Sequence, residues 1–200
     1  MCGRFTQNFT WAEIHAYYSL FQAPLNLEPN YNVCPTDSVG VVVPHLDQRQ
    51  FMGMRWGIIP RWWKLPKKEW KSATFNARAE TVRTLKTFNG PFRDKRCLIP
   101  AGIWDAWYDK EANEDVNSCA MVITKPNKFV AEVHDRMPVI LEPESFETWM
   151  RTTDVEEAAS LLKPPDESVL LKRPVSKRVN SSRTAGDDAT LVEEVRLAAG

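Results

Sequence analysis

The chain has 200 residues, of which 43% are hydrophobic and 26% are charged, as expected for one soluble globular domain with a sizeable core. Its 26 basic and 26 acidic residues cancel, so the protein is not uniformly basic. Four scattered cysteines and three isolated histidines exclude a zinc site, and no apolar run is long enough for a signal peptide or a membrane span. We therefore expect reduced thiols in a cytoplasmic protein, with no metal and no organic cofactor.

The chain begins Met1-Cys2-Gly3-Arg4-Phe5. An initiator methionine is usually removed when a small side chain follows it, and removal would leave an α-amine and a thiol on Cys2. Their reference pKa values are about 7.7–8.0 and about 8.5, so both nucleophiles are partly available near neutral pH. The amine can form a Schiff base with an aldehyde, and the thiol can close on it as a thiazolidine. The alternative is an inert cysteine that packs as a small hydrophobe.

The predicted elements give an α+β pattern without repeats. Thr10 and Glu13 form a capping box at the start of a helix. The apolar face of that helix comprises Trp11, Ile14, Tyr18 and Phe21, and Pro24 lies beyond its end. Residues 29–35 read as a loop.

The rest of the chain alternates strands and helices. Strands are predicted at residues 39–43, 51–59, 97–99, 119–124 and 138–141. Helices are predicted at 129–133, 144–150 and 155–163, the last with Asp154 as its N-cap. Residues 180–200 are polar, and we expect the last of them to be loose.

A basic block lies in the middle of the chain. Residues 51–100 hold twelve Lys or Arg and three Asp or Glu, and the segment 61–71 interleaves five cations with three tryptophans. Single-stranded nucleic acid is bound by this combination, because cations meet the phosphates and flat rings stack on unpaired bases. Core tryptophans beside a solvated lysine face are the alternative interpretation.

Several short motifs occur in a characteristic order. They are MCGRF at the start, YNVCP at 31–35, RWGIIP at 55–60, FNARAET at 75–81, RCLIPA at 96–101, ITKPN at 123–127, HDRMPV at 134–139, PVS at 174–176 and VNS at 179–181. In this ordered set, with cysteine at position 2, the chain resembles the SOS-response-associated peptidase (SRAP) family. Members of that family protect abasic sites in single-stranded DNA by covalent attachment.

The resemblance implies catalytic roles for three residues. Cys2 would be the nucleophile toward the C1′ aldehyde of the ring-opened abasic sugar. Asn76 would hydrogen-bond the sugar-derived hydroxyl or hold the amine, and His134 would pass protons during ring opening and thiazolidine closure. The peptidase activity in the family name would be at most removal of Met1 by the protein itself.

The resemblance also implies a DNA-binding surface. Arginine side chains suit phosphate oxygens, and flat side chains would line the path of the strand. The predicted DNA-binding residues are Arg4, Asn32, Pro35, Trp62, Trp63, Arg78 and Arg136.

Simpler roles compete with these assignments. Asn76 and Arg78 could be a satisfied turn and a surface cation, and His134 could be a core histidine. Asp135 and Arg136 could form a surface ion pair contributing about 0–1 kcal/mol.

The sequence departs from the family pattern after residue 101. The family continues with a G-F-Y-E-W-like stretch whose glutamate serves as acid and base, whereas this chain continues Gly102-Ile103-Trp104-Asp105-Ala106-Trp107. Residues 101–107 look like a later A-G-L-W-E-x-W strand of the family, so the intervening segment with its glutamate is absent. Asp105 and Glu80 are the nearest acidic residues, and neither can be assigned the role. Crosslinking could survive this loss more easily than strand cleavage or reversal.

These observations lead to one main prediction and two alternatives. We expect a single α+β domain over residues 1–185, with a curved or barrel-like mixed sheet and flanking helices, and a polar tail over 186–200. The expected function is capture of abasic sites in single-stranded DNA by a monomer, of host or phage origin, that has no membrane partner and works near replication-fork proteins. The alternatives are a family member that binds single-stranded DNA without reacting, and an amidohydrolase with an N-terminal cysteine nucleophile.

Overall fold

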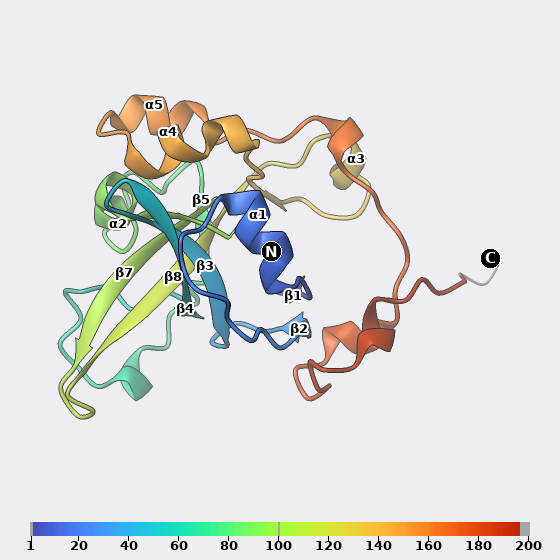
Figure 1. The fold of residues 1–200 in the computed structure, drawn as a ribbon, viewed down its shortest axis with the longest axis horizontal. Coiled ribbons are helices and arrows are strands. Elements are labelled where there is room, and N and C mark those ends of the chain that lie inside the picture. Colours follow the sequence, from blue (N-terminus) through green and yellow to red (C-terminus); the bar gives the residue numbers. More distant parts are fainter. Residues whose placement is uncertain (1, 100, 197–200) are drawn as a thin grey trace.

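A closed five-stranded barrel forms the centre of the protein (Figure 1). The computed structural model describes residues 2–99 and 101–196. Its barrel strands are β3 (Ser38–His45), β4 (Gln48–Trp56), β6 (Arg96–Leu98), β7 (Ala101–Asp109) and β8 (Glu114–Thr124). They pair in the order β4-β3-β6-β7-β8, and β8 returns to β4 in a parallel pairing at Arg55↔Ser118 and Trp56↔Cys119. The predicted α+β fold with a barrel-like mixed sheet is confirmed.

Two antiparallel hairpins, β3–β4 and β7–β8, form most of the barrel wall. Apolar side chains alternate along β3, so one set packs around Trp56 and the other around Phe51. The strand predicted at 51–59 ends at Trp56, because Gly57 turns the chain with a φ of 132°. Ile58 and Ile59 are nevertheless fully buried.

Short strands extend this sheet, and one of them lies beside Cys2. β5 (Asn76–Arg78) pairs in parallel with β8, and β9 (Met137–Pro138) pairs with β8 in antiparallel fashion. The strand predicted at 138–141 is wrong beyond Pro138, although Val139 and Leu141 are buried.

The N-terminal segment forms a separate two-stranded sheet. β1 (Phe5–Gln7) pairs with β2 (Asn30–Val33), so the prediction of a loop over 29–35 is wrong. α1 (Trp11–Tyr18) lies between them in the chain and begins with the predicted capping box. It ends before Phe21, because Ser19 adopts a left-handed conformation with a φ of 52°.

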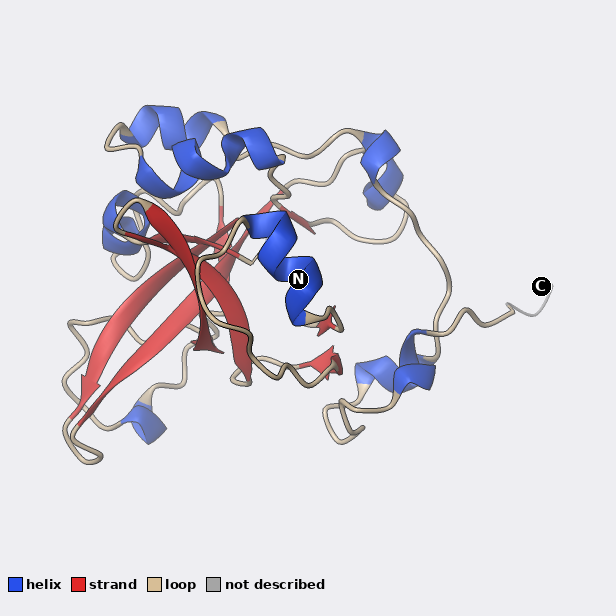
Figure 2. Cartoon of the chain, viewed as in Figure 1, coloured by secondary structure: helices blue, strands red, loops and turns tan. Residues whose placement is uncertain are grey.

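Short helices and 3-10 turns lie at several places around the barrel (Figure 2). They are α2 (Asn89–Asp94), α3 (Lys128–Ala131), α4 (Phe146–Arg151) and α5 (Val155–Ser160), with 3-10 turns η1 (Lys67–Glu69), η2 (Pro143–Ser145) and η3 (Glu167–Val169). Asp154 caps α5 as predicted. The α4 helix is fixed to β6, since the indole nitrogen of Trp149 donates to the carbonyl of Cys97 at 2.9 Å. No helix in the described part of the chain is long and apolar enough to cross a membrane.

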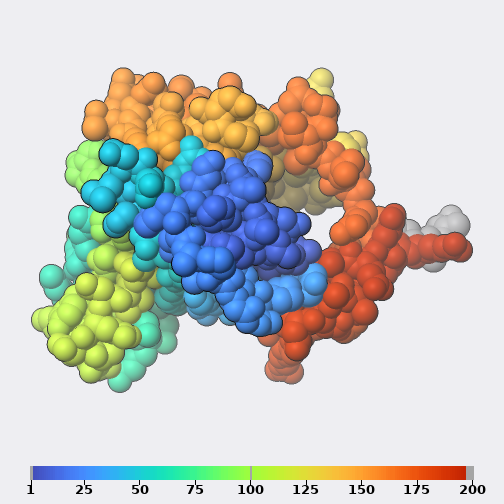
Figure 3. Space-filling model, viewed as in Figure 1, coloured from blue at the N-terminus to red at the C-terminus, as the bar shows by residue number. Residues whose placement is uncertain are grey.

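The C-terminal segment, drawn in red, passes beside the N-terminal sheet (Figure 3). It contains η4 (Lys177–Asn180) and η5 (Ala189–Val192). Leu191 is fully buried, and the backbone nitrogen of Tyr31 donates to the carbonyl of Gly186 at 2.6 Å. Of the predicted tail at 186–200, residues 186–191 therefore contact the rest of the protein, while residues 197–200 lie outside the described residues.

Candidate functional site

The strand β1 holds Cys2 at the side of the barrel. The pairing Phe5↔Val33 aligns β1 with β2, and the ring of Phe5 meets that of Trp56 edge-on, with centroids 4.8 Å apart. Cys2 is thus half-buried. Burial raises the pKa of its thiol, and the negative charge of Asp135 raises this pKa further.

Asn76 connects Cys2 to the barrel. It lies opposite Met121 in the parallel pairing of β5 with β8, and its side-chain nitrogen donates to the backbone carbonyl of Cys2 at 2.8 Å. Its side-chain oxygen Oδ1 is buried and has no hydrogen-bond partner in the described part of the chain. An unpaired buried acceptor is costly, so this oxygen is available for a donor on a bound substrate or on the Cys2 amine.

His134 follows α3 in the segment that leads to β9. Its Nδ1 accepts a hydrogen bond from the backbone nitrogen of Arg136 at 3.0 Å and lies 2.9 Å from a carboxylate oxygen of Asp135. A neutral ring can accept from the amide, and an imidazolium can donate to Asp135, so each state of the ring has a partner. The charge of Asp135, next to His134 in the chain, also contributes to the raised pKa of the Cys2 thiol.

Two arginines predicted to bind DNA have partners within the chain. Arg136 pairs with Glu80 at 2.5 Å. Arg4 donates to Asn32 and to the sulfur of Cys34, both at 2.9 Å. DNA phosphate would therefore compete with or supplement these contacts.

Asn32 is 3% exposed, and its side-chain nitrogen donates to the carbonyls of Ser181 and Thr184 at 3.0 and 3.1 Å. It joins β2 to the C-terminal segment and orients Arg4. Pro35 follows in the turn after β2 and is half-buried. Arg78 is exposed and lies two residues after Asn76, on the same face of β5.

The basic block presents a cluster of tryptophans. Trp62 and Trp63 are half-buried, and Trp70 packs edge-on against both, at 5.9 and 4.9 Å between ring centroids. The ammonium group of Lys86 lies 4.4 Å from the centroid of Trp62. The sequence places Trp70 in the basic block, but it was not among the predicted DNA-binding residues. The lysines around it, Lys67 and Lys71, were the signal that could have added it to Trp62 and Trp63.

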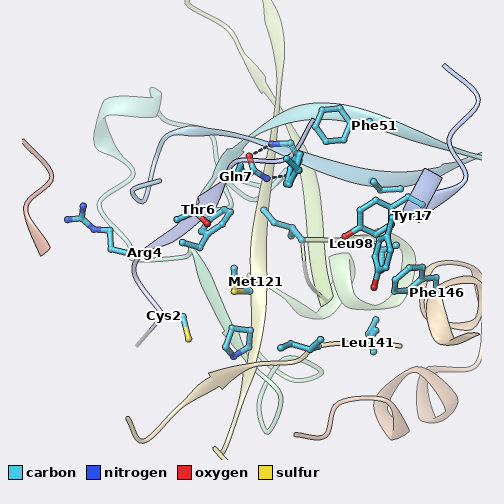
Figure 4. A pocket seen from close by; sticks show the side chains of 18 of the residues that line it. Cys2, Arg4, Thr6, Gln7, Tyr17, Phe51, Leu98, Met121, Leu141 and Phe146 are labelled. Carbon is cyan, nitrogen blue, oxygen red and sulfur yellow. Dashed lines mark hydrogen bonds between the residues drawn. The ribbon is translucent and has the colours of Figure 1, made fainter. Parts of the chain in front are cut away.

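A cavity of about 880 Å³ opens beside Cys2 (Figure 4). Cys2 and Arg4 lie at one end, and Tyr17 and Phe146 lie at the other. Much of the wall between them is apolar and comprises Val42, Phe51, Leu98, Ile99, Met121, Pro138, Ile140 and Leu141. Sequence reasoning missed this cavity, because its wall is assembled from segments far apart in the chain.

Solved structures and curated proteins resemble this chain over most of its length. A protein from Bacteroides thetaiotaomicron has the same fold, with a TM-score of 0.84 and 22% identity over 98% of this chain and all of that chain. Abasic site processing protein YoqW from Bacillus subtilis is 31% identical, over 92% of this chain and 96% of its own length. Abasic site processing protein YedK from Escherichia coli is 26% identical, over 98% of this chain and its full length.

The family described as SOS response associated peptidase (SRAP) matches residues 1–102 and 100–182. These two matches contain Cys2, Asn76 and His134 and the tryptophans of the basic block. The match covers most of the chain, and the similarity to YoqW extends over most of both sequences. The chain therefore belongs to the SRAP family.

Proposed function

We propose that the protein recognises abasic sites in single-stranded DNA and, once Met1 has been removed, captures them covalently through Cys2. The observation that carries this proposal is the pairing of Cys2 with Asn76, which holds the Cys2 carbonyl while its own Oδ1 is buried and unpaired among the described residues. The names of YoqW and YedK, both abasic site processing proteins, support the same substrate.

The reaction needs an amine, a thiol and a carrier for protons. The Cys2 amine adds to the C1′ aldehyde of the ring-opened sugar, water leaves, and the sulfur adds to the resulting Schiff base. Because burial raises the pKa of the Cys2 thiol, the sulfur still carries its proton at neutral pH and must lose it as it attacks. In this scheme His134, with Asp135 beside it, accepts that proton and returns it to nitrogen.

The basic block supplies the surface for the rest of the strand. Trp62 and Trp63 are half-buried, so part of each ring remains accessible to a stacking base, and stacking contributes about 1–3 kcal/mol per base. The exposed Arg78, near Asn76 on β5, would hold a phosphate beside the lesion.

We further propose that the reaction proceeds without the glutamate of the family pattern. The two family matches meet at residues 100–102, where the sequence places the missing segment. Asp105 is 1% exposed and accepts hydrogen bonds from the backbone and side chain of Arg61. Glu80 is paired with Arg136. Both carboxylates are therefore already engaged, and neither takes the place of the family's glutamate. Asp135 is the carboxylate that acts on Cys2. General acid–base groups supply about 10²–10⁴-fold in rate, so crosslink formation should persist while strand cleavage and reversal slow down.

A denaturing gel tests this proposal. Protein whose intact mass shows that Met1 is absent is mixed with a single-stranded oligonucleotide that carries one abasic site. A band that resists denaturation and disappears in Cys2→Ala supports covalent capture. Salt-sensitive binding without such a band, equal for intact and abasic strands, would instead identify a non-covalent DNA-binding protein built on the tryptophan cluster. Turnover of glutamine would point to the amidohydrolase alternative.

A further inference from the structure

We propose that the cavity beside Cys2 binds alkyl aldehydes of medium chain length and that the mature protein holds them as thiazolidines on Cys2. The inference rests on the proposed function in one respect only, the free aminothiol at Cys2. It concerns a substrate class distinct from DNA, because the alkyl chain would extend away from Cys2 and Arg4 along the apolar part of the cavity.

The dimensions of the cavity suit a small molecule. Its volume of about 880 Å³ falls within the range of about 300–1,000 Å³ that is typical of ligand sites. Figure 4 places Cys2 at one end, Tyr17 and Phe146 at the other, and Met121, Leu98 and Leu141 between them. An aldehyde carbon at Cys2 would therefore direct its chain along this apolar wall.

The polarity of the lining selects an alkyl chain over a nucleobase. The side chain of Gln7 is paired at both ends, accepting from the backbone nitrogen of Gly40 at 2.9 Å and donating to its carbonyl at 2.8 Å. Burial raises the pKa of Tyr18 to about 12, so its hydroxyl stays neutral. A base would leave several polar atoms unpaired against Leu98 and Met121, whereas burial of methylene groups is favourable.

The chemistry balances without a further reactant. The Cys2 nitrogen bonds to the aldehyde carbon, the carbonyl oxygen leaves as water, and the sulfur bonds to the same carbon while its proton moves to nitrogen. One aldehyde is consumed and one water is released, with no change in oxidation state. The buried, unpaired Oδ1 of Asn76, whose amide nitrogen already holds the Cys2 carbonyl, can accept from the carbinolamine hydroxyl. Alkyl aldehydes would thus compete with abasic DNA for the amine nitrogen and the sulfur of Cys2.

The dependence of rate on chain length tests the inference. Protein that begins at Cys2, as its intact mass shows, is treated separately with propanal and octanal at low concentration, and thiazolidine formation is followed as a mass gain of aldehyde minus water. The hexapeptide Cys-Gly-Arg-Phe-Thr-Gln serves as a reference without a cavity. We expect octanal to react about tenfold or more faster than propanal with the protein, because each buried methylene favours binding, and about equally with the peptide. Cys2→Ala should form no adduct that survives denaturation.

A cavity-filling variant gives a second test of the octanal preference. Ile140→Trp places a large ring in the wall and should reduce the octanal preference toward that of the peptide. Leu46→Trp, at a position 81% exposed and outside the lining, is the matched control and should retain the preference. If Ile140→Trp fails to fold, the ratio of the octanal rate to the propanal rate on the unmodified protein still tests the inference.

Equal octanal-to-propanal ratios for protein and peptide would overturn the inference, whatever happens with DNA. The abasic oligonucleotide is run in parallel, so the two proposals can fail separately. An octanal preference without a DNA crosslink would support the cavity and sink the proposed function. A DNA crosslink without an octanal preference would support the proposed function and overturn the inference about the cavity.

Discussion

Asn76 is the residue with the most informative contacts in the candidate site. Its amide nitrogen donates to the Cys2 carbonyl, and its amide oxygen is buried and unpaired within the described chain. We predict that Asn76→Ala slows crosslinking of abasic DNA by about 10–100-fold, the effect of losing one or two hydrogen bonds near the reacting atoms. Single-turnover rates at saturating DNA measure the change. Affinity for a strand with a non-aldehyde abasic analogue should change little.

The matched control for this prediction is Asn26→Ala, at an exposed asparagine whose side-chain nitrogen donates to Glu28 at 3.0 Å. Its crosslinking rate should equal that of the unmodified protein. A normal rate in Asn76→Ala, with the fold intact by circular dichroism, would remove Asn76 from the mechanism.

Asp135 gives a prediction about pH. Burial is the main reason that the pKa of the Cys2 thiol is raised, and the charge of Asp135 adds to it. Replacing Asp135 with Asn removes a negative charge that disfavours the thiolate, so the pKa of Cys2 should fall. The pH profile of Cys2 alkylation by iodoacetamide, followed on the Cys2 peptide by mass, should therefore shift to lower pH. Asp187→Asn, at an exposed position in the C-terminal segment, should leave the profile in place.

At the scale of single elements, the tryptophan cluster is held together by a ring outside the pair predicted from sequence. Trp70, directly after η1, packs at 4.9 Å from Trp63 and bonds through its indole nitrogen to Thr74. Trp70→Ala should let the neighbouring rings move and weaken binding to single-stranded DNA by about 1 kcal/mol, or roughly fivefold. The crosslinking rate at saturating DNA should be unchanged.

Fluorescence anisotropy with a labelled oligonucleotide at fixed salt measures the affinity. Leu65→Ala changes another partly exposed apolar residue of the same loop and should bind normally. Equal affinities of Trp70→Ala and the unmodified protein would show that the cluster contributes packing and no stacking surface.

Helix starts with a complete local signal were predicted correctly, and so were β3 and the second half of β8, whereas the short strands β1, β2 and β5 were not. The capping box of Thr10 and Glu13 starts α1, and Asp154 caps α5, because each signal is complete within four residues. Asn30–Val33 alternates polar and apolar residues, but the run is only four residues long, it lies between Pro29 and Pro35, and its partner β1 is distant in the chain. The last strand spans only Met137–Pro138, although the backbone nitrogen of Val139 still donates to the carbonyl of Val122 at 2.9 Å.

The residues of the candidate site could be predicted from the sequence, but the contacts between them could not. The resemblance predicted Cys2, Asn76 and His134 as site residues, and the structure joins two of them through the hydrogen bond from Asn76 to the Cys2 carbonyl. The environment of Asn32 could not be predicted, because its partners Ser181 and Thr184 lie about 150 positions away in the sequence. No local pattern encodes that contact.

At the scale of the whole molecule, the barrel, the N-terminal sheet and the C-terminal segment depend on one another. The barrel closes through β4 and β8 and gives β5 its place beside Cys2. The C-terminal segment contacts β2 at Tyr31 and Asn32, and Asn32 in turn binds Arg4, two residues from the nucleophile. The arm that carries Cys2 is therefore positioned from both ends of the chain.

Leu191 tests this dependence, because it is fully buried in a segment that composition alone marks as a polar tail. Truncation of a buried leucine to alanine costs about 2–5 kcal/mol, so Leu191→Ala should lower the free energy of unfolding in urea by roughly that amount. Val169→Ala, at a position 50% exposed, should cost well under 1 kcal/mol. Loosening of the segment should also release Asn32 and Arg4, so Leu191→Ala should crosslink abasic DNA more slowly even where urea curves show that it is fully folded. A large loss of stability with an unchanged crosslinking rate would mean that the segment supports the fold without positioning Cys2.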